Sequence, residues 1–280
     1  MSALINRELF EKESFDIILL IGQSNAEGFG RGEVENAYEP NNSIMQLTNT
    51  APVFLEITPQ DVPILHIEEP SSYRIDVAAE TVHPERGILG CLALPFAKRY
   101  YEKYISGTER KLLVIRAAVG SSGFLRGNWC LGEPLYERAV EMTRLALSLN
   151  PKNRLTAVLW HQGESDAIVG RRLGGYEFIY PYYMEKLSAI IDDLRDRFGE
   201  APFIAGAMCR EWTVTIQETS DAVENATKEI IEKTKLAAFV KSEGLRSNDS
   251  VVKNGDSIHF SRPDLYKLGE RYFEKYEEIR

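Results

Sequence analysis

The chain has 280 residues, of which 44% are apolar and 27% charged, and its formal net charge is −9. This composition is typical of a soluble globular protein, and the negative charge argues against nucleic acid or an anionic membrane surface as its main partner. No apolar run approaches the roughly 18 residues of a membrane span. The amino terminus lacks a basic region followed by an apolar core, so we expect no secretory signal and a cytoplasmic location. The three cysteines are too few and too scattered for a disulfide framework or a zinc site.

Apolar runs typical of strands alternate with helical patterns along most of the chain. Helical spacing of apolar residues follows Pro134 and again Tyr176, and Ser261 with Asp264 three residues later marks the start of a last helix. Such alternation predicts a mostly parallel sheet with helices on both faces. We therefore expect a single three-layer α/β/α domain over residues 1–280. The runs that predict buried strands are residues 16–22, 112–120, 155–163, 202–207 and 236–242.

Residues 31 to about 86 interrupt this alternation. They hold six prolines among short apolar pieces, and they predict no long helix. An irregular excursion of this length is usually functional or mobile. We expect it to form one wall of a ligand pocket.

The most unusual polar clusters of the sequence follow predicted strands. Ligands of open parallel α/β sheets bind beyond the carboxyl ends of the strands. A further cluster, residues 256–259, precedes the last helix. If the strands are parallel, all of these clusters can meet in one crevice. The clusters that follow strands are residues 22–25, 120–123 and 160–166.

Ser24 lies directly after the first predicted strand and is a candidate nucleophile. A serine hydroxyl becomes a strong nucleophile when a base removes its proton. Of the four histidines, His259 has an acid at a spacing that can orient it locally, because Asp256 precedes it by three residues. A tight turn lets that carboxylate reach the near ring nitrogen and leaves the far nitrogen for Ser24.

A tetrahedral intermediate also needs hydrogen-bond donors for its oxyanion. The backbone N–H groups of Ser24 and Gly120 and the side-chain amide of Gln162 are candidates. Each cluster also has a plainer interpretation, as a strand-to-loop turn, a helix cap or a hydrogen-bonded loop around Trp160. The occurrence of all the clusters in one chain, at the expected positions, favours catalysis.

These clusters resemble the motif blocks of the SGNH (GDSL-type) hydrolase superfamily, and within it the sialate O-acetylesterase-like and acetylxylan esterase group of carbohydrate esterases. Residues 22–25 are similar to the block that carries the nucleophile, and residues 117–124 to the block that contributes a backbone oxyanion donor. Residues 160–166 resemble the third block, with a Gln in place of an Asn. Residues 256–260 are similar to the last block, which holds the acid and the base. The matches cover residues 17–270 in the expected order.

The resemblance implies a flavodoxin-like α/β/α sandwich and no metal or organic cofactor. It implies that Ser24 is the nucleophile, that His259 is the base and that Asp256 orients it. It also implies that Gly120 and Gln162 complete the oxyanion hole. Supporting roles, by the same resemblance, belong to Gln23, Asn25 and Glu164.

Two positions depart from the family pattern. Ser121 stands where the second glycine of a Gly-Gly pair is usual, which leaves open whether Gly120 or Ser121 gives its N–H to the oxyanion. His161 stands where a tyrosine often precedes the glutamine of the third block. We expect the His161 side chain to influence what the pocket accepts, without a catalytic role.

We therefore expect a serine carboxylesterase that removes O-acetyl groups from sugars or oligosaccharides through an acetyl-enzyme. The preference for acetyl follows from the resemblance alone. Two alternatives stay open: the same triad acting on other acyl esters, and a non-catalytic carbohydrate-binding protein. Tyr38, Phe54 and Tyr73, within residues 31–86, are candidates for stacking on sugar rings. The expected partner is an acetylated sugar, not nucleic acid or a membrane, and the sequence leaves the oligomeric state open.

Overall fold

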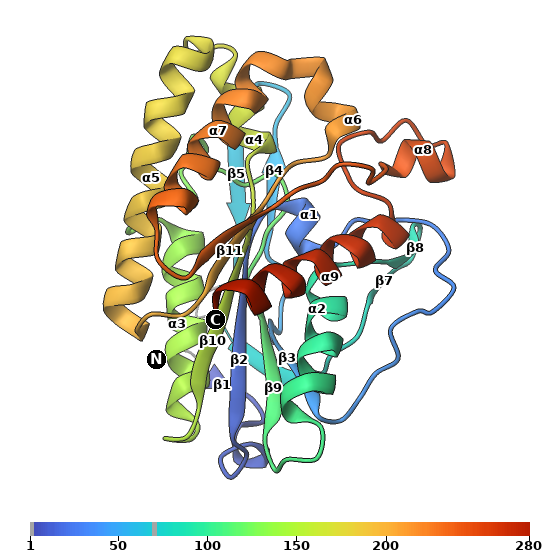
Figure 1. Cartoon of the computed structure of the whole chain (residues 1–280), viewed down its shortest axis with the longest axis vertical. Coiled ribbons are helices and arrows are strands. Elements are labelled where there is room, and N and C mark those ends of the chain that lie inside the picture. The colour runs from blue at the N-terminus through green and yellow to red at the C-terminus, as the bar shows by residue number, and fades with distance from the viewer. Residues whose placement is uncertain (1–2, 69–71) are drawn as a thin grey trace.

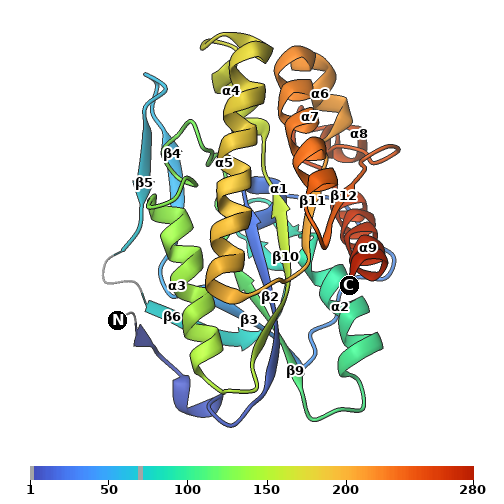
Figure 2. The same cartoon turned by 60° about the vertical axis from the view of Figure 1, so that its left-hand side comes forward.

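The computed structural model describes residues 3–68 and 72–280. Its centre is an eight-stranded sheet with the strand order β1-β6-β3-β9-β2-β10-β11-β12. Neighbouring strands are parallel, except that β6 runs antiparallel to β3 (Figures 1 and 2). In spatial order the strands are β1 (Ala3–Leu4), β6 (Ser72–Val77), β3 (Ile44–Asn49), β9 (Lys111–Arg116), β2 (Phe15–Gly22), β10 (Arg154–His161), β11 (Phe203–Gly206) and β12 (Ala237–Val240).

Helices cover both faces of this sheet. The central strand β2 is apolar from Ile17 to Ile21 because its side chains alternate between the two faces: Leu19 and Ile21 belong to the core on one side, and Ile18 and Leu20 to the core on the other. Figures 1 and 2 show α3, α5 and α7 over the first face and α2 and α9 over the second. These helices are α2 (Ala93–Tyr100), α3 (Pro134–Ser148), α5 (Gly175–Phe198), α7 (Gln217–Lys233) and α9 (Arg262–Ile279).

Shorter helices occupy the connections between these elements. A π-helix continues α2, and short helices of four to seven residues follow β2, β10 and β11. Among the described residues, no helix is both long and apolar enough to cross a membrane. The shorter helices are η1 (Arg7–Leu9), α1 (Ser24–Glu27), η2 (Tyr101–Ile105), α4 (Glu164–Gly170), α6 (Arg210–Thr213), η3 (Val214–Ile216) and α8 (Asn248–Val252).

The predicted three-layer α/β/α architecture is confirmed. The five predicted strands are β2, β9, β10, β11 and β12, and the helices predicted after Pro134, Tyr176 and Ser261 are α3, α5 and α9. The Ser261 hydroxyl accepts the N–H of Asp264 at 3.3 Å, as a helix N-cap does. Helix α7 was not predicted, because much of its buried face consists of alanine and threonine, which give a weak hydrophobic period.

The excursion at residues 31–86 is more regular than its sequence suggests. It contributes β3 and β6 to the main sheet, the hairpin of β4 (Phe54–Ile57) with β5 (Pro63–His66), and the first strand of the hairpin of β7 (Thr81–His83) with β8 (Gly87–Leu89). Residues 31–43 form neither helix nor strand. Residues 69–71 lie outside the described residues. The two strands that join the sheet are short and lie far apart in sequence, so only their long-range pairing reveals them.

A buried carboxylate anchors the amino-terminal end of β2, away from the polar clusters. Asp16 is fully buried and accepts hydrogen bonds from Tyr100 at 2.7 Å, from Arg110 Nε at 2.8 Å and from Arg154 Nε at 2.8 Å. Burial alone would raise the pKa of Asp16, but these bonds outweigh it and lower that pKa. The ionised carboxylate therefore ties β2 to its neighbours β9 and β10 at this edge of the sheet.

Asp16→Asn is expected to lower the free energy of unfolding by about 3 kcal/mol at pH 7, because two guanidinium groups lose their buried counter-charge. Since folding lowers the pKa of Asp16, its contribution is complete above the unfolded value of about 4 and is lost as the pH falls through the lower folded value. Urea denaturation of both proteins should therefore show a stability difference that shrinks below about pH 4. A difference that stays constant down to pH 3 would contradict this role.

Candidate active site

Ser24 lies at the carboxyl end of the central strand β2, where α1 begins. Gly22 ends the strand with a φ of +129°, and a Cβ there would lie 2.1 Å from the carbonyl oxygen of His161 on β10. Only glycine fits such a position. The N–H of Gln23 then donates to the same carbonyl at 3.0 Å. Gly22 and this hydrogen bond thus position the turn at which α1 begins with Ser24.

The structure brings the three predicted triad side chains together. His259 Nε2 lies 2.8 Å from Ser24 Oγ, and His259 Nδ1 lies 2.9 and 3.0 Å from the two carboxylate oxygens of Asp256. Ser24 is 4% exposed, and the side chains of His259 and Asp256 are 17% and 25% exposed. In this arrangement the imidazole can take the serine proton while the carboxylate stabilises the resulting charge.

The loop between α8 and α9 holds the acid and the base. Asn248, which the sequence analysis missed, donates from Nδ2 to Asp256 at 2.9 Å and to the carbonyl of Phe29 at 3.0 Å. Its backbone N–H donates to the carbonyl of His259 at 2.8 Å. Burial alone would raise the pKa of Asp256, but the bonds from His259 and Asn248 lower it to about 2. Asp256 is therefore an anion throughout the neutral range.

Asn25 joins the nucleophile turn to the histidine loop. Its Nδ2 donates to Glu164 at 2.6 Å and to the carbonyl of Ile258 at 3.1 Å, and its Oδ1 accepts the N–H of Phe260 at 3.0 Å. Glu164 is fully buried, and burial raises the pKa of its carboxyl. Asn25 thus connects the residues on both sides of His259 to the buried Glu164 carboxyl.

The side chains of Gln23 and Gln162, from the first and third blocks, contact one another. Gln23 Oε1 accepts the N–H of Ser165 at 3.1 Å and Nε2 of Gln162 at 3.1 Å. Gln162 Nε2 also lies 2.7 Å from Asp166 Oδ2 and 3.3 Å from the carbonyl of Ser122. Its two amide hydrogens thus face three acceptors. Gln162 can serve an oxyanion only by exchanging one of these bonds.

The loop of residues 120–123 lies beside the nucleophile, as expected for a backbone oxyanion donor. A Cβ on Gly120 would lie 3.6 Å from Cβ of Ser24 and 3.2 Å from Glu27 Oε2. The N–H of Gly120 donates to that carboxylate oxygen at 2.6 Å. Ser121 follows with a φ of +60°, which is uncommon for a residue other than glycine, and its carbonyl accepts the Ser165 hydroxyl at 2.8 Å.

An aromatic ring not identified from the sequence covers the base. Phe29 stacks on the His259 imidazole with centroids 5.1 Å apart, and the Arg86 guanidinium lies 5.6 Å from the Phe29 centroid.

The three aromatic candidates for sugar stacking differ in their exposure to solvent. Tyr38 and Tyr73 are buried, so that suggestion is wrong for both, whereas Phe54 is 49% exposed and stacks on His66.

The other histidines lie away from the reacting atoms. His161 is fully buried with Nδ1 2.9 Å from the Tyr272 hydroxyl, and burial lowers its pKa to about 3. It therefore stays neutral and does not line the pocket, contrary to expectation. His66 pairs with Glu56 on the β4–β5 hairpin, and His83 lies on β7. Within the described chain, no group of three His, Cys, Asp or Glu side chains could hold a metal ion.

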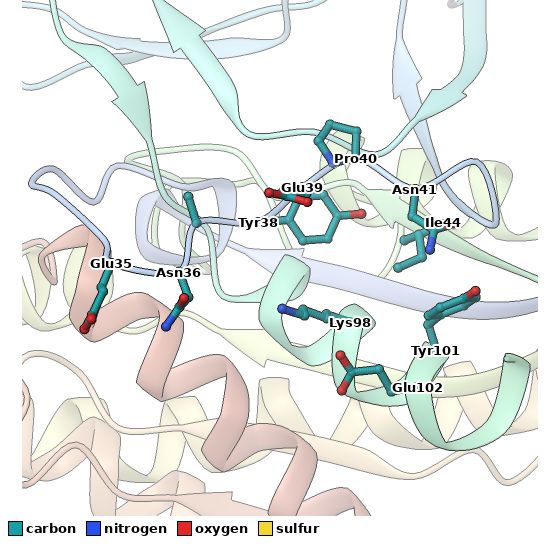
Figure 3. A pocket seen from close by; sticks show the side chains of 11 residues that line it. Glu35, Asn36, Tyr38, Glu39, Pro40, Asn41, Ile44, Lys98, Tyr101 and Glu102 are labelled. Atoms are coloured by element: carbon teal, nitrogen blue, oxygen red, sulfur yellow. The ribbon is translucent and has the colours of Figure 1, made fainter.

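A cavity of about 640 Å³ lies elsewhere on the molecule (Figure 3). It is bounded by residues 35–41 on one side and by Lys98, Tyr101 and Glu102 on the other. Tyr38, one of the candidates for sugar stacking, lines it, whereas none of the predicted catalytic, oxyanion-hole or supporting residues does. The cavity is therefore separate from the candidate active site.

Three solved structures share this fold. NanS is 21% identical with a TM-score of 0.69, over 95% of this chain and 97% of that chain. A protein from Arabidopsis thaliana is 19% identical with a TM-score of 0.66, over 94% and 98% of the two chains. A carbohydrate acetylesterase from Xanthomonas citri is 16% identical with a TM-score of 0.58, over 94% of this chain and 56% of that one. At these identities the likeness establishes the fold.

The family model gives a stronger result. No curated protein matches the chain. The model described as "carbohydrate esterase, sialic acid-specific acetylesterase" matches residues 14–278, which is nearly the whole chain and includes every candidate site residue. The resemblance drawn from the four polar clusters is thereby confirmed. The chain belongs to the carbohydrate esterase family of sialic acid-specific acetylesterases.

Proposed function

We propose that this enzyme hydrolyses O-acetyl esters of sugars through an acetyl-enzyme on Ser24. The observation that carries the proposal is the continuous chain of contacts from Ser24 Oγ to His259 and on to Asp256. His259 takes the proton of Ser24 as its oxygen attacks the acetyl carbonyl. The imidazolium then gives that proton to the departing sugar oxygen. Water, deprotonated by the same imidazole, releases acetate and restores Ser24.

The oxyanion of each tetrahedral intermediate needs donors close to Ser24. The N–H of Ser24, at the start of α1, has no acceptor within its own helix and is the first donor. The second is an N–H of the loop at Gly120 and Ser121, and the side-chain amide of Gln162 is the third candidate. Preorganised donors of this kind stabilise the developing charge more than water can.

The choice of an acetylated sugar as substrate is supported by the family and by the similarity to the carbohydrate acetylesterase from Xanthomonas citri. It is tested by measuring acetate release from mono-O-acetylated sugars, and by comparing p-nitrophenyl esters from acetate to octanoate. We expect acetyl esters to be the best substrates and turnover to fall steadily with acyl length. Preference for long acyl chains would favour the lipid-ester alternative. Saturable sugar binding without acetate release would favour a binding protein.

A covalent trap tests the mechanism separately. A small alkyl phosphonate ester should inactivate the enzyme and add its mass to the peptide that contains Ser24, because the phosphonyl group mimics the acyl group attacked by the serine. Acetylated sugar should slow the labelling. Inactivation through a different residue would contradict the assignment of the nucleophile.

A further inference from the structure

One of the candidate oxyanion donors already forms a hydrogen bond to a carboxylate of the protein. Glu27 is the last residue of α1 and, three residues after Ser24, lies on the same side of that helix. Its Oε2 accepts the N–H of Gly120 at 2.6 Å. A Cβ on Gly120 would meet Glu27 Oε2 at 3.2 Å, Ser24 Cβ at 3.6 Å and the Phe29 ring at 3.7 Å. The Glu27 carboxylate and the nucleophile thus flank the same glycine.

In the described part of the chain, no arginine donates a hydrogen bond to this carboxylate. Arg116 donates to the main-chain carbonyl of Glu27 at 2.6 Å, and Arg138 donates to the carbonyl of Ala117 and to Asn49, each at 2.9 Å. Among the described residues, the N–H of Gly120 is the one donor found on the Glu27 carboxylate. Burial raises the pKa of this carboxyl, and Gly120, Arg116 and Arg138 offset the rise only in part. A carboxylate held by a single neutral donor moves more readily than one in a bidentate ion pair.

An acyl oxyanion and the Glu27 carboxylate cannot both accept the same N–H. We propose that Glu27 caps the oxyanion hole of the free enzyme and selects esters that stand beside a free sugar hydroxyl. Such a hydroxyl donates to the carboxylate when the ester carbonyl displaces it from Gly120. An ester without a neighbouring hydroxyl leaves the displaced carboxylate without a donor. This inference rests on the proposed esterase function and assigns Glu27 as its specificity residue.

The expected discrimination follows from the cost of an unpaired polar group. A buried acceptor that loses its donor without replacement is destabilised enough to change a rate constant by about tenfold or more. Sites that hydrogen-bond a substrate hydroxyl reject analogues that lack it for the same reason. We therefore expect the wild-type enzyme to prefer a methyl xyloside with one O-acetyl group over the same xyloside with every hydroxyl acetylated.

The test compares kcat/KM of the wild type and Glu27→Ala on these two xylosides and on p-nitrophenyl acetate. Removal of the cap should raise kcat/KM about tenfold for the fully acetylated xyloside and for p-nitrophenyl acetate. It should lower kcat/KM for the mono-acetylated xyloside, which loses its hydroxyl acceptor. Glu27→Gln, whose amide oxygen can still accept the Gly120 N–H, should give an intermediate preference and decides the matter if Glu27→Ala does not fold.

Glu224→Ala is the matched control. Glu224, on α7, is a second half-buried carboxylate that accepts a main-chain N–H, from Met208 at 3.2 Å, and burial raises its pKa as it does for Glu27. Unlike Glu27, it also pairs with a lysine, Lys228, at 3.4 Å. Its loss should leave the preference between the xylosides unchanged. An equal fall on all substrates in Glu27→Ala would overturn the proposal, because Glu27 would then only position Gly120. An equal rise on all would also overturn it. If the wild type releases acetate from none of the esters, the proposed function itself fails.

Discussion

Ser24→Ala is expected to reduce kcat for acetate release by about 10⁴-fold or more. The hydroxyl is the atom that His259 Nε2 contacts at 2.8 Å, and the alanine has nothing with which to form an acetyl-enzyme. At about 1.4 kcal/mol per tenfold, a 10⁴-fold loss corresponds to about 5 kcal/mol of transition-state stabilisation. Initial rates with p-nitrophenyl acetate and with a mono-acetylated xyloside measure the loss on two leaving groups.

The fold should survive this substitution. The side chain of Ser24 is small, and its change to alanine adds no volume at a buried position. Thermal unfolding of the variant should therefore match the wild type within a few degrees. Ser257→Ala, in the same loop as the base and without a predicted role, serves as the control and should retain full activity. Activity in Ser24→Ala within tenfold of the wild type would make Ser24 a turn residue and would remove the proposed mechanism.

The sequence predicts those site residues whose positions depend on residues close to them in the chain. Gly22 is the last residue of β2, whose apolar run is recognisable in the sequence, and Ser24 follows two residues later. Gly22 ends the strand because no Cβ fits beside His161. Asp256 and His259 are three residues apart, so their contact depends on one turn. Parallel strands then bring both segments to the same edge of the sheet. Short-range geometry and topology together are sufficient for these residues.

The parts that were missed depend on contacts between distant segments. Asn248 lies eight residues before Asp256 and also donates to the carbonyl of Phe29, 219 residues away, and the sequence around Asn248 carries no motif. Phe29 lies on His259 across 230 residues of chain. Tyr38 and Tyr73 were misjudged because burial within an irregular segment has no period to read. The contact of Glu27 with Gly120 likewise depends on the fold, which brings α1 next to the loop of residues 120–123.

Asp256→Asn is expected to lower kcat/KM for acetate release by about 10³- to 10⁴-fold at pH 7. An amide cannot stabilise the imidazolium of His259, and its NH₂ group disfavours the tautomer that accepts the proton of Ser24. Asn248→Ala keeps the carboxylate and removes one hydrogen bond to it, at 2.9 Å, so we expect a smaller loss of about tenfold. The two variants therefore separate the charge of Asp256 from its positioning.

The pH dependence distinguishes this role from a structural one. Folding lowers the pKa of Asp256 to about 2, so the charge is complete above the unfolded value of about 4 and is lost only as the pH falls toward 2. Titration of Asp256 thus contributes nothing to the activity profile between pH 5 and 8, and the deficit of Asp256→Asn should remain above about tenfold across that range. A deficit that disappears at pH 5, or a variant within tenfold of the wild type at pH 7, would mean that His259 acts without this carboxylate.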